Sequence, residues 1–407
     1  MAPNDQDGPF PWHLGVFDSH CHPTDTMSSI KRISSMKARS LTIMATRSQD
    51  QDLVFSVAEK HGVKSSKIED WKREECVVPA FGWHPWFSYQ MYMQDEHEES
   101  KLLTEDQKIT HYQSVLQPCP KDPTKEERRA LLSMPDPQPF NKFLRETRKT
   151  LLRHPYALIG EIGLDRSFRI PESWIPENEA QRNSTLTPGG REGRRLSPYR
   201  VNLKHQKAIV KAQLQLAAEL GRAVSMHGVQ AHGAVFETIK ELWVGHERKV
   251  LSKRERRKMG DGAKGGSEEK REPEETKDGK KKPYPPRICL HSYSGDASTI
   301  KQYLNPAIPV EMFFSFSTAI NLSDLESRDD STPQDFVELV KGIPDHMLLV
   351  ESDLHVAGED MDQRLEDIVR RICGIKGWAL EEGVKQLGKN WRRFVFGEDA
   401  EGGGPAE

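Results

Sequence analysis

Eight short apolar runs that alternate with longer helix-like stretches constrain this sequence most. The runs are rich in aliphatic and β-branched residues, as buried strands are. They cover residues 14–19, 41–46, 77–82, 156–162, 223–226, 287–290, 310–316 and 346–351. Strands that alternate with helices form parallel sheets, and eight such units predict an α/β fold, the closed (β/α)₈ or TIM barrel.

The stretches between these runs have the character of amphipathic helices. They cover residues 24–39, 50–61, 138–153, 202–220, 233–245, 297–304 and 334–341, and two more follow the last run at 360–373 and 378–395. The clearest is 202–220, which has Asn202 as a plausible N-cap and Gly221 as a stop signal. We therefore expect one barrel domain over residues 14–397.

Three segments interrupt the alternation. Residues 88–137 are polar and proline-containing, and residues 166–200 contain STLTPGGREGRR, so we expect insertion loops at both. Residues 248–282 hold 14 Lys or Arg and 8 Asp or Glu, with almost no apolar side chains. Such a segment cannot bury enough surface to offset the entropy of ordering, so we expect a disordered insertion.

Composition excludes several classes of protein. The net charge of −3 is not that of a basic nucleic-acid coat. The five cysteines form no CxxC pair, which fits a reducing compartment. The sequence shows no signal peptide and no apolar stretch long enough to span a membrane. We expect a cytoplasmic or nuclear protein without a membrane partner, and favour a monomer.

Side chains suited to binding metals follow most of the predicted strands. In such a barrel the C-terminal strand ends carry the functional groups. The residues at these ends are His20 and His22, His84, Glu161, His227, His291 and Asp353. Because side chains alternate along a strand, His20 and His22 should both point into the barrel mouth. Cys21 should point toward the helices and pack there.

Each of these residues has an ordinary explanation by itself. A single histidine is often a satisfied polar group, and an acidic residue after a strand often caps a helix. Convergence at one mouth is different, because burying so many ionisable groups without a cation is costly. Imidazoles suit Zn²⁺, Mn²⁺ or Fe, and carboxylates bind harder ions or bridge two of them. Two such metals about 4 Å apart activate a shared water.

Six motifs in order, SHCH, GWHPW, GEIGLD, a histidine after the fifth run, LHSYSG and ESD, resemble the TatD family of metal-dependent deoxyribonucleases. The resemblance spans residues 14 to about 397, and NWRRFVF near its end resembles the closing helix of the family. GWHPW together with ESDLHVAG looks most like the fungal branch, which is named for interaction with a subunit of the anaphase-promoting complex. A protein partner in a cell-cycle complex is therefore implied by resemblance alone.

The resemblance also implies a role for each motif. Two divalent ions (Zn, Mn or Mg) would be bound, the first by His20, His22, Glu161 and Asp353, the second by Glu161, His227 and His291. Asp353 and Glu161 would be the catalytic residues, and Asp353 would orient or deprotonate the attacking water. His84 would contact the substrate phosphate. The substrate would be DNA, which family members often hydrolyse from its 3′ end.

The sequence departs from the family at two places. The family usually has an arginine two residues after the fifth-strand histidine, where this chain has Val229, and Ala-Pro after the last aspartate, where it has Leu354 and His355. Either the cationic partner of the phosphate is missing, or another residue such as Arg166 or a loop lysine supplies it. Two alternatives stay open: a metal hydrolase of amides or esters, and a metal-retaining partner protein with little nuclease activity. A lysine at the position of Glu161 would favour the first.

Overall fold

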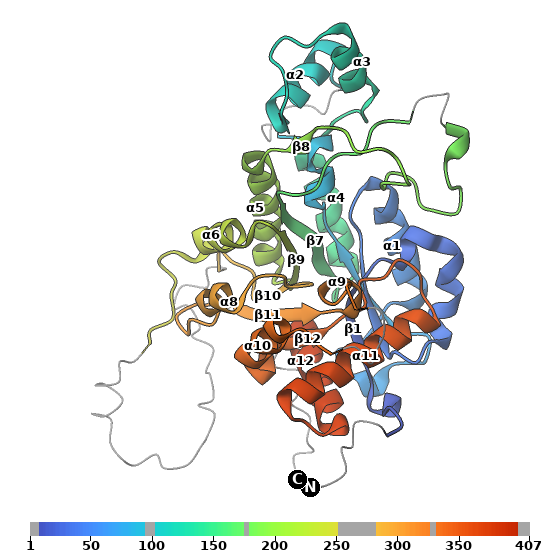
Figure 1. The fold of residues 1–407 in the computed structure, drawn as a ribbon, viewed down its shortest axis with the longest axis vertical. Coiled ribbons are helices and arrows are strands. Elements are labelled where there is room, and N and C mark those ends of the chain that lie inside the picture. The colour runs from blue at the N-terminus through green and yellow to red at the C-terminus, as the bar shows by residue number, and fades with distance from the viewer. Residues whose placement is uncertain (1–7, 94–101, 175–178, 251–281, 326–330, 398–407) are drawn as a thin grey trace.

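The computed structural model describes residues 8–93, 102–174, 179–250, 282–325 and 331–397. Within them, eight parallel strands form one sheet in the order β1-β2-β3-β7-β9-β10-β11-β12. The strands are β1 Phe17–Cys21, β2 Ser40–Met44, β3 Val77–Phe81, β7 Leu158–Asp165, β9 Val224–Val229, β10 Arg287–Leu290, β11 Glu311–Phe316 and β12 Leu348–Val350. All eight predicted strands are confirmed, and the sheet curls into a nearly closed barrel (Figure 1).

The barrel closes where the first strand meets the last. The backbone N–H of Asp353 donates to the carbonyl of His20 at 3.0 Å, and that of His22 donates to the carbonyl of Leu354 at 2.9 Å. These bonds join the chain just past β12 to the end of β1. Residues more than three hundred positions apart in the sequence therefore become neighbours at the mouth.

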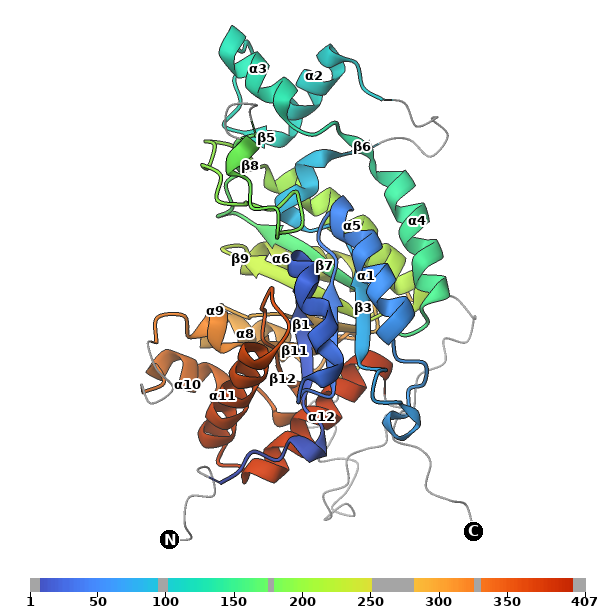
Figure 2. The ribbon, with the colours of Figure 1, turned by 90° about the vertical axis from the view of Figure 1, so that its right-hand side faces the viewer.

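Helices cover the outside of the sheet (Figures 1 and 2). Those that follow the barrel strands are α1 Ser48–His61, α4 Phe140–Arg153, α5 Leu203–Leu220, α6 His232–Trp243, α8 Ala297–Tyr303, α9 Thr318–Asn321, α10 Gln334–Gly342, α11 Glu359–Lys376 and α12 Leu380–Phe396. In α5 the Asn202 side chain accepts a bond from the backbone N–H of His205, and Gly221 ends the helix with φ 64°. Both predicted signals are confirmed.

The helix predicted at 24–39 is instead a 3₁₀ helix, η3 Pro23–Ser35, with a non-helical residue at Thr26. The segment PTDTMSSIKRISS is rich in Ser and Thr, whose side chains compete for backbone hydrogen bonds and weaken an α-helix. Further short 3₁₀ turns are η2 Trp12–Leu14, η4 Ile68–Asp70, η5 Pro85–Gln90, η6 Glu179–Gln181 and η7 Asp345–Met347.

The prediction of a loop over 88–137 is wrong in part, because this segment holds two helices, α2 Glu105–Val115 and α3 Lys125–Ser133. Each begins with a capping box, on Thr104 and on Thr124. The signals TEDQ and TKEE were present in the sequence. The helices stand apart from the barrel at one end of the molecule (Figure 1) and share a small apolar core that includes Tyr112 and Leu131.

The insertion at 166–200 packs against that same region. Its described residues are mostly irregular, and they lead into β8 Arg200–Val201, which pairs antiparallel with β5 Leu116–Gln117. A second small parallel pair joins β4 Met91–Tyr92 to β6 Gln138–Pro139. The charged insertion predicted at 248–282 lies, except for its ends, outside the described residues.

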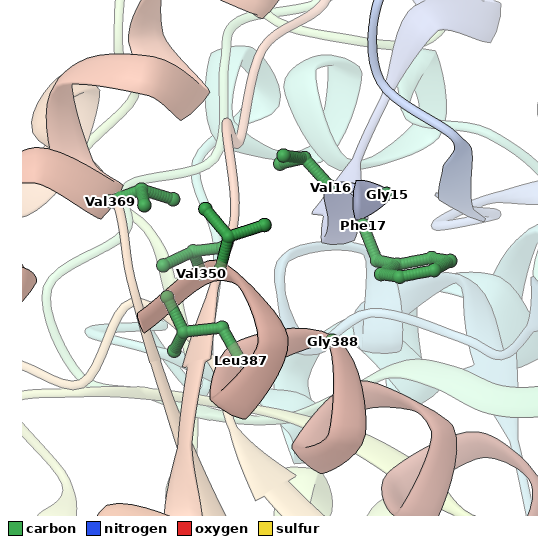
Figure 3. A pocket seen from close by; sticks show the side chains of 8 residues that line it. Gly15, Val16, Phe17, Val350, Val369, Leu387 and Gly388 are labelled. Carbon is green, nitrogen blue, oxygen red and sulfur yellow. The ribbon is translucent and has the colours of Figure 1, made fainter. Parts of the chain in front are cut away.

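An aromatic cluster fills the base of the barrel, opposite the mouth. Trp391 on α12 stacks on Phe17 of β1, with ring centroids 4.5 Å apart. Phe394, also on α12, packs on Phe313 of β11. Beside this cluster a small apolar pocket lies between β1, β12, α11 and α12, lined in part by Val16, Val350 and Leu387 (Figure 3). Helix α12 thus seals the base beside the seam between β1 and β12. Among the described residues, no helix is long and apolar enough to cross a membrane.

Candidate functional site

Every side chain predicted for the site comes to one place, the mouth of the barrel. The strands carry or directly precede these residues, which are His20, His22, His84, Glu161, His227, His291 and Asp353. All are buried except Asp353, whose side chain is 12% exposed. Glu161 lies where the register between β7 and β9 shifts, between Ile159 and Ile162.

One oxygen of Glu161 faces the histidines of the first strand. Its Oε2 lies 3.3 Å from Nε2 of His20 and 3.3 Å from Nε2 of His22. The two nitrogens are 3.1 Å apart. Oδ1 of Asp353 adds a second carboxylate, 3.3 Å from Nε2 of His22 and 3.8 Å from Nε2 of His20. Two imidazoles and two carboxylates therefore converge on one point.

The other oxygen of Glu161 faces a different set. Its Oε1 lies 2.7 Å from Nε2 of His291, 2.9 Å from Nδ1 of His227 and 3.0 Å from Nε2 of His84. The nitrogens of His227 and His291 that face it are 3.2 Å apart. Glu161 is thus the one residue shared by both halves of the site.

Several contacts fix which ring nitrogens face Glu161. Nδ1 of His20 lies 2.8 Å from Oγ of Ser225, which leaves Nε2 for the site. Nε2 of His227 lies 3.1 Å from Oδ2 of Asp165, which leaves Nδ1 for the site. A carboxylate on the far nitrogen is the arrangement that orients metal-binding histidines.

The pKa values show how the buried charges interact. Burial raises the pKa of Glu161, but His84, His291 and His20 outweigh it and hold that pKa well below its usual value. Burial lowers the pKa of His22, but Asp353 and Glu161 raise it to about 9. For His84 burial dominates, and its pKa falls to about 4. Without a cation, this cluster balances its carboxylates by protonating some imidazoles, and a bound metal would replace those protons.

The donor set fits divalent metal ions. Two ligands bound to Zn²⁺ at 2.0–2.1 Å with a tetrahedral angle would lie about 3.4 Å apart, close to most of the spacings around Glu161. Two groups that could hold an ion share this residue: His20, His22 and Glu161, and His84, Glu161 and His227. Within each group the three ligand atoms lie within 4.8 Å of one another. Mixed imidazole and carboxylate ligands suit Zn²⁺ or Mn²⁺.

Comparison with known proteins agrees with this geometry. Residues 17–396 match the family described as TatD related DNase. The chain belongs to this family. It is 34% identical over 380 residues to the Cut9-interacting protein scn1 of Schizosaccharomyces pombe, across 93% of this chain and 98% of that protein. It is 27% identical over 397 residues to an uncharacterized deoxyribonuclease of Saccharomyces cerevisiae, across 93% and 99%.

A solved structure shares the fold of this TatD protein. It is an uncharacterized amidohydrolase from Saccharomyces cerevisiae, with a TM-score of 0.50 and 13% sequence identity, and the match covers 95% of this chain and 100% of that one. The predicted family and barrel are confirmed. Membership of the TatD family supports a metal-dependent hydrolase.

His84, which was predicted to contact the substrate phosphate, lies against Glu161 at the centre of the TatD site. Its Nδ1 accepts a bond from the backbone N–H of Trp86 at 3.2 Å, so the proton of a neutral ring sits on Nε2. That Nε2 then donates to Oε1 of Glu161 at 3.0 Å. Both ring nitrogens are engaged, and in this geometry His84 orients Glu161. Contact with substrate stays a prediction.

Sequence reasoning missed the acidic residues beneath the TatD site. Glu351 is fully buried, accepts bonds from the backbone N–H of Ser292 at 2.8 Å and from the Ser315 hydroxyl, and lies 3.6 Å from Nδ1 of His291. The signal was its place in ESD, next to the strand end.

Asp18 is a second buried acid that the sequence did not single out. It accepts bonds from the backbone N–H groups of His20 and Ser352 at 3.1 and 3.0 Å and from the Ser352 hydroxyl at 2.5 Å. Burial raises its pKa to about 7 despite these bonds. Asp18 therefore ties β1 to the chain after β12, directly behind the side chains that could bind a metal.

Asp165 braces the half of the site that contains His227. Its Oδ2 accepts bonds from Nε2 of His227 and, at 2.6 Å, from Nε1 of Trp86, and its Oδ1 accepts from the backbone of Phe168. Trp86 in turn stacks on Phe168 at 4.3 Å. Cys21 is buried among apolar side chains with Sγ 3.5 Å from the carbonyl of Thr42, so it packs as expected.

Proposed function

We propose that this protein is a metal-dependent phosphodiester hydrolase that acts on DNA through two divalent ions. The observation that carries the proposal is the position of Glu161, whose two oxygens face two separate sets of imidazoles. A carboxylate shared in this way is the usual bridge of a two-metal site. The first ion would be held by His20, His22, Glu161 and Asp353, and the second by Glu161, His227 and His291.

The bound ions would lower the pKa of a water molecule and neutralise charge on the phosphodiester. The protein supplies the rest. Asp353 is the most exposed carboxylate of the cluster, and although burial raises its pKa, the neighbouring His22, His20 and His291 lower it to about 2. It is therefore ionised at neutral pH and able to orient a water by accepting a hydrogen bond from it. Glu161 contacts the imidazoles directly, and Glu351 and Asp165 orient His291 and His227 from behind.

DNA is proposed as the substrate from the family and from its relatives. The family is described as TatD related DNase, and one curated relative is named a deoxyribonuclease. Hydrolysis of an amide or ester is the alternative, and a lysine at position 161 would favour it. This chain has a glutamate there. The glutamate in that place favours phosphodiester hydrolysis.

The test pairs metal analysis with digestion of 3′-labelled DNA. We expect about two divalent ions per chain and cleavage that a chelator abolishes and Mn²⁺, Zn²⁺ or Mg²⁺ restores. Glu161→Ala and Asp353→Ala should abolish cleavage. Glu69→Ala is the control, because Glu69 is exposed on η4, at the opposite end of the barrel. Two bound metals with no cleavage under any ion would rule out the nuclease, and absence of bound metal would refute the site itself.

A protein partner is the second candidate role. It rests on similarity to the Cut9-interacting protein of Schizosaccharomyces pombe. We propose that this chain also binds a protein of a cell-cycle complex, in the cytoplasm or nucleus. Co-purification from the native cell, with wild type and Glu161→Ala side by side, tests it. If wild type and Glu161→Ala recover equal amounts of one specific partner, binding does not depend on catalysis. If neither recovers a partner when expressed at its native level, the proposed binding role is contradicted.

A further inference from the structure

Two aromatic side chains stack on each other beside the half of the site that contains His227. Trp86 lies on η5, and Phe168 lies three residues past the end of β7. Their ring centroids are 4.3 Å apart and their planes differ by 8°. Trp86 also meets the ring of His227 nearly at a right angle, with centroids 5.9 Å apart. Phe168 is therefore one ring removed from a proposed metal ligand.

One carboxylate fixes both aromatic residues. Oδ2 of Asp165 accepts a bond from Nε1 of Trp86 at 2.6 Å, and Oδ1 accepts a bond from the backbone N–H of Phe168 at 2.9 Å. The same Oδ2 also contacts Nε2 of His227, at 3.1 Å. The stacked pair and the imidazole thus share one anchor. A ligand that binds to the pair is placed at a defined position relative to the nitrogens that face Glu161.

Packing of the core does not explain the position of Phe168. Its side chain is only partly buried, and it does not pack against any of the apolar clusters found among the described residues. Trp83, on the other side of His84, shows the contrast. Trp83 is 3% exposed, belongs to an apolar cluster, and donates from its Nε1 to the carbonyl of Phe87. It is a packing residue, whereas Phe168 has Trp86 on one face and no second aromatic partner in the described part of the chain.

We propose that Phe168 forms a stacking subsite for a nucleobase of the substrate. This inference rests on the proposed hydrolysis of DNA. Every nucleobase has a flat π-face, which stacks on an aromatic side chain with little dependence on sequence. A base on the face of Phe168 opposite Trp86 continues the stack and holds the attached phosphodiester near the mouth. Because Asp165 already fixes both rings, little side-chain entropy is lost on binding.

The test compares the affinities of two ligands for the metal-loaded protein by calorimetry. The ligands are deoxyadenosine 5′-monophosphate and 2-deoxyribose 5-phosphate, which differ by the base. Wild type should bind the nucleotide about tenfold or more tighter. Phe168→Ala should lose this preference, while its affinity for the sugar phosphate and its metal content stay unchanged. Phe168→Tyr keeps the aromatic face and should keep the preference.

Phe10→Ala is the matched control. Phe10 is also partly buried and pairs with a tryptophan, Trp12, at 4.7 Å between ring centroids, but it precedes β1 and lies toward the base of the barrel. Both affinities should stay unchanged in this variant. In steady-state cleavage of an oligodeoxynucleotide, Phe168→Ala should raise KM more than it lowers kcat. If Phe168→Ala does not fold, Phe168→Leu, which keeps apolar volume without a π-face, takes its place.

The two ligands separate stacking from a structural role. Equal affinity of wild type for both would overturn the inference, and so would an unchanged preference in Phe168→Ala. Loss of metal or of sugar-phosphate binding in that variant would overturn it as well, because Phe168 would then act by supporting Asp165. If wild type prefers the nucleotide through Phe168 but cleaves no DNA, the subsite stands and the proposed nuclease activity fails. Cleavage of DNA without the preference would leave the nuclease and remove the subsite.

Discussion

The mouth and the base lie at opposite ends of the same eight-stranded barrel and contain opposite kinds of side chain. At the base, Phe17, Phe313, Trp391 and Phe394 pack against one another, and their burial stabilises the fold. At the mouth, five imidazoles surround Glu161 at a similar depth, where burial of polar groups costs free energy. The base therefore determines whether the chain folds, and the mouth determines what the folded chain binds.

The largest effect should come from Glu161→Gln, which breaks the mouth alone. Losing the shared ligand removes metal stabilisation of the reaction, worth several kcal/mol, so kcat/KM should fall by about 10³-fold or more. Metal content should fall with it. Circular dichroism should show a folded barrel. If the variant unfolds, the mouth also contributes to the stability of the fold.

Trp391→Ala breaks the base alone. Truncating a buried tryptophan costs about 3–5 kcal/mol, because the stack on Phe17 and the bond from its Nε1 to Thr42 at 3.2 Å are lost. We expect that loss in urea unfolding, with kcat of the folded fraction unchanged. Trp378→Ala, at a partly exposed tryptophan, should cost clearly less. A changed kcat would mean that the base also shapes the mouth.

Glu351→Gln should have a smaller effect confined to the mouth. This buried acid faces Nδ1 of His291 at 3.6 Å, and loss of such an outer partner lowers metal affinity about 10–100-fold. Competition with a chelator of known affinity measures the change. Because Gln retains the shape, stability should hold. Unchanged affinity would show that Glu351 serves only the Ser292 turn.

The smallest effect should come from pH acting on the α2 helix. Burial, together with His205, lowers the pKa of His111 to about 4 although its ring bonds the carbonyl of Tyr89. A depressed histidine pKa stabilises the fold above the unfolded pKa of about 6.5, and that stability is lost as pH falls toward 4. We expect about 2 kcal/mol less stability at pH 5 than at pH 7.5 from this residue. His111→Gln should remove that part of the slope, and an unchanged slope would exclude His111 as its source.

The predictable parts of the molecule are those that a local pattern specifies. Apolar runs located every barrel strand, and polar residues at their ends identified the side chains that converge at the mouth, because parallel strands bring their ends together. The helices at Glu105–Val115 and Lys125–Ser133 also had local signals, which the prediction of a loop did not use.

The contacts of the buried side chains depend on distant segments. The substrate contact of His84 stays a prediction, whereas its tautomer follows from the backbone of Trp86 and the position of Glu161, which the sequence does not specify. Glu351 stands in the ESD motif, but its burial and its contacts with Ser315 and His291 depend on other strands, which the motif does not specify.

The seam between β1 and β12 has a consequence for synthesis. His20 leaves the ribosome early, whereas Asp353 follows more than three hundred residues later. At about 5–20 residues per second, roughly 15 to 60 s pass before the bond from Asp353 to the carbonyl of His20 can form. A nascent or prematurely terminated chain therefore contains most of the ligands but no closed mouth. The proposed metal site can therefore be completed only after the last strand has been synthesised.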